Sequence, residues 1–149
     1  MRRVSRSAIV PYSAEQMFAL VEDVEAYPSF LPWCNDVEVH LRDGDVVEVT
    51  LELHKGKLSR RFRTRNTLRR CDAMDLALIG GPFKRLSGGW KFLQLGEEGS
   101  KVALELEFEF DSRMLDMVIG AYFEDICNKL VDAFTRRATV IYGCGNASV

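Results

Sequence analysis

A two-residue period of apolar side chains runs through the middle of the chain, from residue 35 to residue 110. Such alternation is typical of strands that bury one face and expose the other. Turn sequences divide the stretch into hairpins, among them Asp43-Gly44 and the segment from Gly96 to Gly99. The pattern predicts about six antiparallel strands, and the alternating segment Val4–Val10 adds one more ahead of them.

Two short helical segments are expected between the first strand and the alternating region. Ser13 and Gln16 have the spacing of a capping box, which starts a helix with Met17, Leu20 and Val21 on one face. Residues 26–34 follow with two prolines and four large apolar residues. Because proline interrupts regular elements, this segment is expected to be a short helical turn that plugs one end of the fold.

The segment Ser112–Tyr142 has apolar residues at helical spacing and predicts one long amphipathic helix. The positions that define this face are Leu115, Ile119, Phe123, Ile126, Leu130, Phe134 and Ile141. The first half, Met114–Phe123, is apolar nearly all round, so we expect it to be covered on more than one side or to form a pocket wall. The second half, through Leu130 and Phe134, is expected to anchor the helix on the sheet.

These elements together predict an α+β fold in which a curved antiparallel sheet of six or seven strands wraps around the long C-terminal helix. An internal pocket is expected between the sheet, the helix and the two short helices. The length of 149 residues suits one domain over residues 1–149, with residues 144–149 expected to be a flexible tail.

Composition narrows the classes of function. A net charge of −2 argues against a DNA-binding protein, and nucleic-acid binding would need a local basic patch. No apolar run approaches the ~20 residues that cross a bilayer, so a cytoplasmic protein is expected, with peripheral contact to the inner membrane left open. The four cysteines, Cys34, Cys71, Cys127 and Cys144, lack the spacing of a metal site.

Three stretches, residues 27–34, 81–92 and 129–138, resemble START-like proteins of the polyketide cyclase/dehydrase type. Within that superfamily they resemble the branch of coenzyme Q-binding proteins and the ribosome association toxin RatA. The resemblance implies a helix-grip fold with a hydrophobic pocket. Members of the branch are described as binding ubiquinone or as blocking the association of ribosomal subunits.

The predicted pocket residues are mostly aromatic, which suits a flat ring with an isoprenoid tail. Each of them alone is better explained as a core residue, and only together do they favour a pocket. Thr64 and Asn66 are expected on the same inward face as Phe62, where they could meet quinone oxygens or an internal water. The predicted ligand-binding residues are Pro28, Phe30, Leu31, Trp33, Phe62, Thr64, Asn66, Phe83, Trp90, Phe92, Phe108, Ile119, Tyr122 and Phe123.

The strand from Leu58 to Arg70 is strongly basic on its outward face. Its arginines could pair with Glu48 and Glu52 of the preceding strand. They could equally contact RNA or an anionic membrane surface, and the sequence leaves both alternatives open. The residues proposed for such contact are Arg61, Arg63, Arg65 and Arg69.

Catalysis finds little support, because His40 and His54 fall on the polar face of their strands and no inward acid or base is predicted. We therefore expect a non-catalytic protein with no metal site. The leading hypothesis is a carrier or chaperone for a ubiquinone-like quinone or lipid. The alternative is a regulator that binds the large ribosomal subunit and blocks subunit association, and a polyketide cyclase ranks last.

Overall fold

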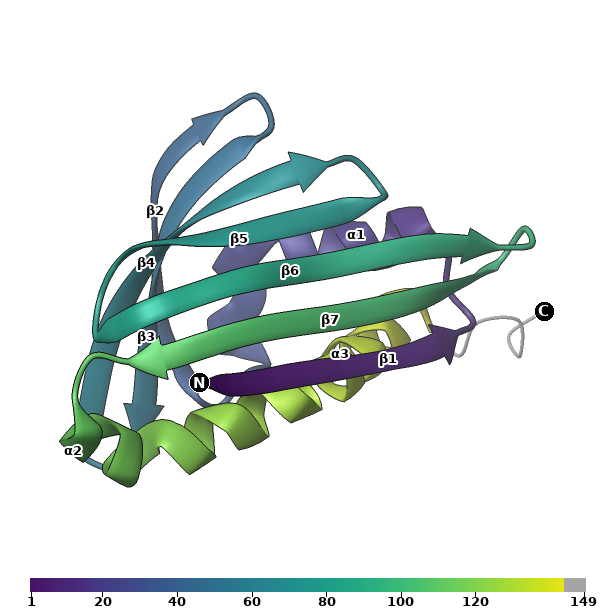
Figure 1. Cartoon of the computed structure of the whole chain (residues 1–149). Coiled ribbons are helices and arrows are strands. Elements are labelled where there is room, and N and C mark those ends of the chain that lie inside the picture. The colour runs from purple at the N-terminus through teal and green to yellow at the C-terminus, as the bar shows by residue number, and fades with distance from the viewer. Residues whose placement is uncertain (144–149) are drawn as a thin grey trace.

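The computed structural model describes residues 1–143, in which seven strands form a single antiparallel sheet with helices packed on one of its faces (Figure 1). The order of strands across the sheet is β1-β7-β6-β5-β4-β3-β2. The strands are β1 (Arg2–Val10), β2 (Cys34–Asp43), β3 (Val46–Lys55), β4 (Leu58–Arg69), β5 (Ala73–Gly80), β6 (Phe83–Leu95) and β7 (Gly99–Phe110). The helical segments are α1 (Ala14–Glu22), η1 (Val24–Ser29), α2 (Arg113–Leu115), η2 (Asp116–Gly120) and α3 (Ala121–Tyr142). The tail predicted at 144–149, including Cys144, lies outside the described residues.

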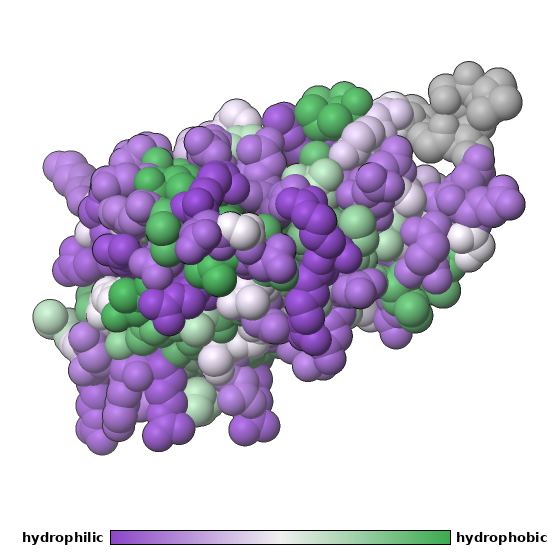
Figure 2. Space-filling model, turned by 90° about the horizontal axis from the view of Figure 1, so that it is seen from above, coloured by the Kyte–Doolittle hydropathy of each residue, from purple (hydrophilic) through white to green (hydrophobic). Residues whose placement is uncertain are grey.

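The alternating pattern is confirmed as a sheet with one buried face. β7 shows this most clearly, because its inward side chains are at most 5% exposed; they are Val102, Leu104, Leu106, Phe108 and Phe110. The outward side is polar, and Figure 2 shows hydrophilic residues over most of the face seen from above, with hydrophobic ones in separate patches. The predicted α+β helix-grip architecture is therefore confirmed.

The two short helices form where expected. In the capping box, Ser13 Oγ accepts from the Gln16 backbone nitrogen at 3.1 Å, and the Ser13 nitrogen donates to Gln16 Oε1 at 2.9 Å. η1 is a 3-10 helix that contains Pro28. It packs against β2 and closes one end of the concave face.

The C-terminal helix is not one regular α-helix. After the short α2, residues Asp116–Gly120 form a π-helical turn, and α3 begins at Ala121. At this turn Arg2 of β1 lies across the helix and donates to Asp116 at 2.9 Å and to Glu124 at 2.9 Å. A Cβ atom on Gly120 would lie 2.7 Å from the Arg2 guanidinium, so a glycine here leaves room for that ion pair. The sequence does not reveal this widened turn, because its partner Arg2 is more than 110 residues away.

The expectation that Met114–Phe123 is covered on more than one side is wrong. Met114 is 69% exposed, Met117 85% and Val118 52%, whereas Ile119 and Phe123 are buried. This part of the helix has one buried side only. Ile141, the last of the apolar positions predicted to define the helix face, is not buried either, since it is 49% exposed.

Candidate functional site

A cavity of ≈ 80 Å³ lies between the concave face of the sheet, the segment around η1 and α3. It is almost entirely apolar. Its walls consist of Val24, Tyr27, Leu31, Trp33, Val49, Leu51, Phe62, Thr64, Asn66, Met74, Leu76, Leu86, Trp90, Leu106, Phe123, Ile126, Cys127, Leu130 and Phe134.

Strand register brings the wall residues of the sheet together. Thr64 of β4 lies opposite Val49 of β3, and Asn66 lies opposite Leu76 of β5. Because successive side chains alternate between the faces of a sheet, Thr64 and Asn66 both point to the concave side. The polar pair therefore lies within a wall of aliphatic and aromatic side chains.

Half of the predicted ligand-binding residues line this cavity: Leu31, Trp33, Phe62, Thr64, Asn66, Trp90 and Phe123. The other half lie elsewhere. Those residues are Pro28, Phe30, Phe83, Phe92, Phe108, Ile119 and Tyr122, and none of them is on the cavity wall.

The aromatic residues that miss the cavity are part of the packed core. Phe83, Phe108 and Phe123 pack ring to ring, with centroids 4.9 Å apart for Phe108 and Phe123 and 5.3 Å for Phe83 and Phe123. Phe92 packs edge-on against Phe18 of α1. Phe83, Phe92 and Phe108 therefore lie in the core of this structure, which is the alternative that the sequence left open for them.

Of the four remaining residues, Ile119 is buried in the core and the other three lie towards the surface. Tyr122 donates from its hydroxyl to the carbonyl of His54 at 3.1 Å. Phe30 is half-buried beneath the guanidinium of Arg137, 4.8 Å from the ring centre, and Pro28 is exposed.

The long helix contributes to the cavity through a different part than predicted. The wall is formed by α3 residues Phe123, Ile126, Cys127, Leu130 and Phe134, whereas Met114–Phe123 was expected to be the wall and the second half the anchor. The prediction that the first half forms the wall is therefore wrong except for Phe123, because the second half, which was expected only to anchor the helix, supplies the other wall residues. The spacing of three and four residues from Phe123 onward is the signal that could have identified these positions.

Two buried polar groups face each other within the cavity wall. Thr64 is 4% exposed and Asn66 3%, and the Thr64 hydroxyl donates to Asn66 Oδ1 at 2.8 Å. The Asn66 side chain thus places an amide group within the apolar wall of the cavity. An amide group carries two N–H donors, which suit a carbonyl oxygen of a bound molecule or a water.

The titratable groups of the cavity wall are neutral. Burial raises the pKa of the Cys127 thiol and of the Tyr27 hydroxyl, which donates to the carbonyl of Val21. The wall carries no carboxylate, imidazole or amine within the described part of the chain, and residues 1–143 contain no group of three His, Cys, Asp or Glu placed to hold a metal ion. This arrangement can bind an apolar molecule with one polar contact.

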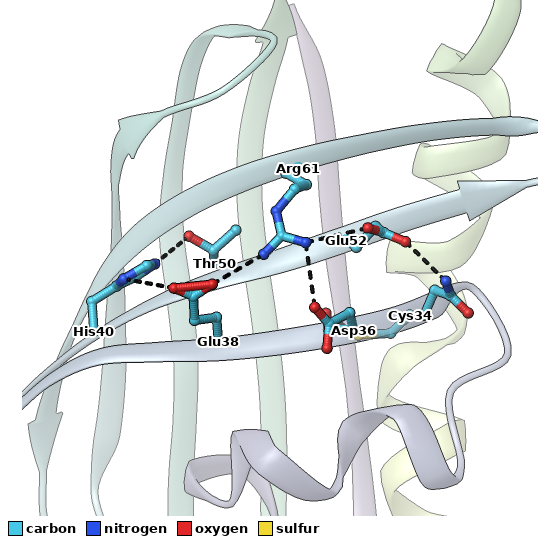
Figure 3. A network of polar contacts seen from close by, with 8 residues as sticks. Cys34, Asp36, Glu38, His40, Thr50, Glu52 and Arg61 are labelled. Atoms are coloured by element: carbon cyan, nitrogen blue, oxygen red, sulfur yellow. Dashed lines mark hydrogen bonds and ion pairs between the residues drawn. The ribbon is translucent and has the colours of Figure 1, made fainter.

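The outward face of β4 carries ion pairs to its neighbours (Figure 3). Arg61 lies between three carboxylates, at 3.3 Å from Asp36, 3.5 Å from Glu38 and 3.3 Å from Glu52. Glu38 also contacts His40, which hydrogen-bonds to Thr50 at 2.7 Å. His40 is thus a member of this polar network on the outer face.

The other predicted contact arginines are also paired. Arg63 lies 2.8 Å and Arg65 3.0 Å from Glu48, and Arg69 lies 3.1 Å from Asp75 of β5. Pairing within the sheet, one of the two alternatives, is thus present. Contact of the same arginines with RNA or a membrane surface stays a prediction.

Comparison with known proteins identifies the family. Residues 10–135 match the family described as polyketide cyclase / dehydrase and lipid transport. A curated relative, the ribosome association toxin RatA of Vibrio cholerae, is 44% identical over 143 residues, covering 96% of this chain and 99% of the relative. The chain belongs to this family, in its RatA/COQ10 branch.

A more distant relative is similar in sequence, and two solved structures share the fold. The mitochondrial coenzyme Q-binding protein COQ10 homolog B of Xenopus laevis is 28% identical over 144 residues, covering 93% of this chain and 59% of the relative. The solution structure of an 18 kDa Caulobacter crescentus protein is 34% identical, with a TM-score of 0.74 over 96% of this chain and 99% of that one. A START superfamily protein from Mycobacterium smegmatis shares the fold at 22% identity, with a TM-score of 0.73 over 91% of this chain and 95% of that one.

Among residues 1–143, no helix is both long and apolar enough to cross a membrane.

The outer-face ion pairs predict a loss of stability in acid. Hydrogen bonds from Arg63 and then Arg65 lower the pKa of Glu48 below its ordinary value of 4.5. Because the pKa is lower in the folded state, the stabilisation is complete above about pH 4.5 and is lost as the pH falls through the lower folded value. Glu48→Gln should therefore lower Tm at pH 7 and lower it less at pH 3, measured by circular dichroism.

Glu97→Gln is the matched control, because Glu97 lies in the β6–β7 turn and has no ion pair within residues 1–143. It should leave Tm unchanged at both pH values. If Glu48→Gln behaves in the same way as Glu97→Gln, the pairs to Arg63 and Arg65 do not stabilise the fold.

Proposed function

We propose that this protein is a non-catalytic cytoplasmic regulator that binds the large ribosomal subunit and hinders its association with the small one. The observation that carries the proposal is the 44% identity to a ribosome association toxin along 96% of this chain and 99% of that relative. The alignment covers the cavity and the outer face of the sheet. Surface residues as well as core residues are therefore aligned with those of the toxin.

The arginines of β4 suit contact with ribosomal RNA even though they are paired. The side chains of Arg65 and Arg69 are 55% and 59% exposed. Exposed ion pairs contribute only about 0–1 kcal/mol, so exchanging a carboxylate for an RNA phosphate costs little. Contacts of this kind weaken as salt rises, because bound counterions are released from the RNA.

Sucrose-gradient profiles of ribosomes with and without the protein test the proposal. We expect the protein to reduce joined ribosomes, to increase free subunits and to sediment with the large subunit. Arg65→Glu combined with Arg69→Glu should weaken the effect, whereas Arg3→Glu, which changes an exposed arginine of β1, should not. An unchanged ratio of joined to free subunits with wild-type protein would exclude the function.

A second candidate function is the binding of an apolar molecule with a carbonyl oxygen, such as a quinone. It is supported by the Asn66 amide group in an otherwise apolar cavity wall and by the relative named as a coenzyme Q-binding protein. The cavity of ≈ 80 Å³ is smaller than the ~150 Å³ that holds benzene, so a ring would enter only if the walls move apart. Leu51, Leu76 and Leu130 are half-buried and mark where the wall is thinnest.

Leu130→Trp should abolish uptake of a short-chain ubiquinone by filling the cavity, while Asn66→Val should weaken it about tenfold by removing one hydrogen bond. Quenching of Trp33 and Trp90 fluorescence reports the binding, and circular dichroism confirms that each variant is folded. Full quinone uptake by Leu130→Trp would mean that the ring does not occupy this cavity. Mass spectrometry of solvent extracts would identify a copurified ligand.

A further inference from the structure

One turn of the C-terminal helix presents large apolar side chains to solvent. Met114, Met117 and Val118 are 69%, 85% and 52% exposed, and their spacing of three and four residues puts them on one side of the helix. Single exposed apolar residues are ordinary, but three on one convex turn indicate a surface that is covered in use. We call these three residues the exposed apolar turn.

The two acidic groups nearest the exposed apolar turn are paired with one arginine. Asp116 and Glu124 both accept hydrogen bonds from Arg2, each with a closest distance of 2.9 Å. Arg2 in turn lowers the pKa of Asp116, which therefore stays ionised and paired. The carboxylates of Asp116 and Glu124 thus share a single cation of the same chain.

The cations around the turn remain available. Arg113 directly precedes Met114, and the ammonium group of Lys55 lies 5.1 Å from the centre of the Tyr122 ring, one helical turn after Val118. The Tyr122 hydroxyl at the start of α3 donates to the His54 carbonyl, and in Figure 1 the end of β3 lies beside the helix that follows α2. Within residues 1–143, Arg113, Lys55 and Lys57 make no ion pair.

We infer that the exposed apolar turn inserts into the surface of an anionic lipid bilayer, with Arg113, Lys55 and Lys57 on the lipid headgroups. Apolar side chains projecting from a helix beside unpaired cations are the combination that binds such a surface. Methionine side chains are flexible enough to pack among acyl chains. A stable protein partner would need about 20–30 residues from each side, and RNA phosphates offer nothing to methionine and valine.

Sedimentation with vesicles tests this inference. Wild-type protein should bind vesicles that contain phosphatidylglycerol, bind vesicles of pure phosphatidylcholine much less, and lose binding as salt rises. Met117→Glu combined with Val118→Glu should reduce the partition coefficient at least tenfold, and Lys55→Glu combined with Arg113→Glu should remove the preference for phosphatidylglycerol. Both variants change exposed side chains and should unfold at the wild-type temperature.

Val140→Glu is the matched control, because Val140 is 73% exposed on the same helix but far from the turn. It should bind vesicles as the wild type does. Equal binding by wild type and Met117→Glu/Val118→Glu would overturn the inference, as would wild-type protein that ignores the vesicles. A dimer in sedimentation velocity that only this double variant loses would show instead that the turn joins two copies. Subunit association in sucrose gradients is read separately, so this result does not depend on the ribosome proposal.

Discussion

Gly88→Ala is expected to lower the free energy of unfolding by about 3 kcal/mol or more, because the added methyl has no space and the backbone conformation is unfavourable. Gly88 has φ = 130°, and a Cβ there would lie 2.0 Å from the carbonyl oxygen of Glu105 in β7. The obstacle is backbone in the middle of the sheet, which cannot move without breaking hydrogen bonds between β6 and β7. Urea denaturation followed by circular dichroism measures the loss.

Gly80→Ala is the control for this experiment. Gly80 has no atom within 4 Å of its would-be Cβ and no positive φ, so the change should stay within about 0.5 kcal/mol. Similar unfolding curves for the two variants would mean that β6 does not need a glycine at position 88 to approach β7. The curvature of the sheet would then not depend on this glycine.

Phe134→Ala should cost about 3–5 kcal/mol, since it removes a buried ring from the centre of the helix–sheet contact. Phe134 is 1% exposed, and its ring centre lies 5.2 Å from Trp90, 5.4 Å from Tyr27 and 5.3 Å from Phe30. The missing ring would also enlarge the cavity, so benzene should raise Tm of the variant more than that of the wild type. Thermal unfolding with and without benzene measures both effects.

Ile141→Ala serves as the control on the same helix, because Ile141 is 49% exposed and its removal should cost no more than about 0.5 kcal/mol. If Phe134→Ala is as stable as Ile141→Ala, the helix is not anchored through Phe134. If benzene has no effect on Phe134→Ala, the space left by the ring has collapsed.

The local elements of the fold could be predicted because their causes are local. The alternation in β7 and the capping box of Ser13 and Gln16 depend on residues that are close together in sequence, and the structure contains both. The π turn could not be predicted, because it lies where Arg2 reaches Asp116 across the fold. The exposure of Met117 likewise depends on which parts of the fold pack near it, and its position in the helical repeat does not reveal this.

The cavity could be predicted only in part, for a related reason. Alternation identifies which side chains point inward, and so it identified Phe62, Thr64 and Asn66 correctly. It does not show which inward rings fill space and which leave a gap, so Phe83 and Phe108 were assigned to the pocket although they pack against each other. Pairing of the β4 arginines with Glu48 and Glu52 was one of two alternatives from the sequence, and strand register places Glu48 opposite Arg65 and Glu52 opposite Arg61.

Reassociation of purified ribosomal subunits, followed by light scattering, tests the proposed function most directly. The large subunit is first incubated with the protein, the small subunit is then added, and the reverse order serves as the control. The proposal predicts that reassociation is inhibited when the large subunit is treated first and much less when the small subunit is treated first. Reassociation at the untreated rate and to the untreated extent, with protein in excess over subunits, would contradict it.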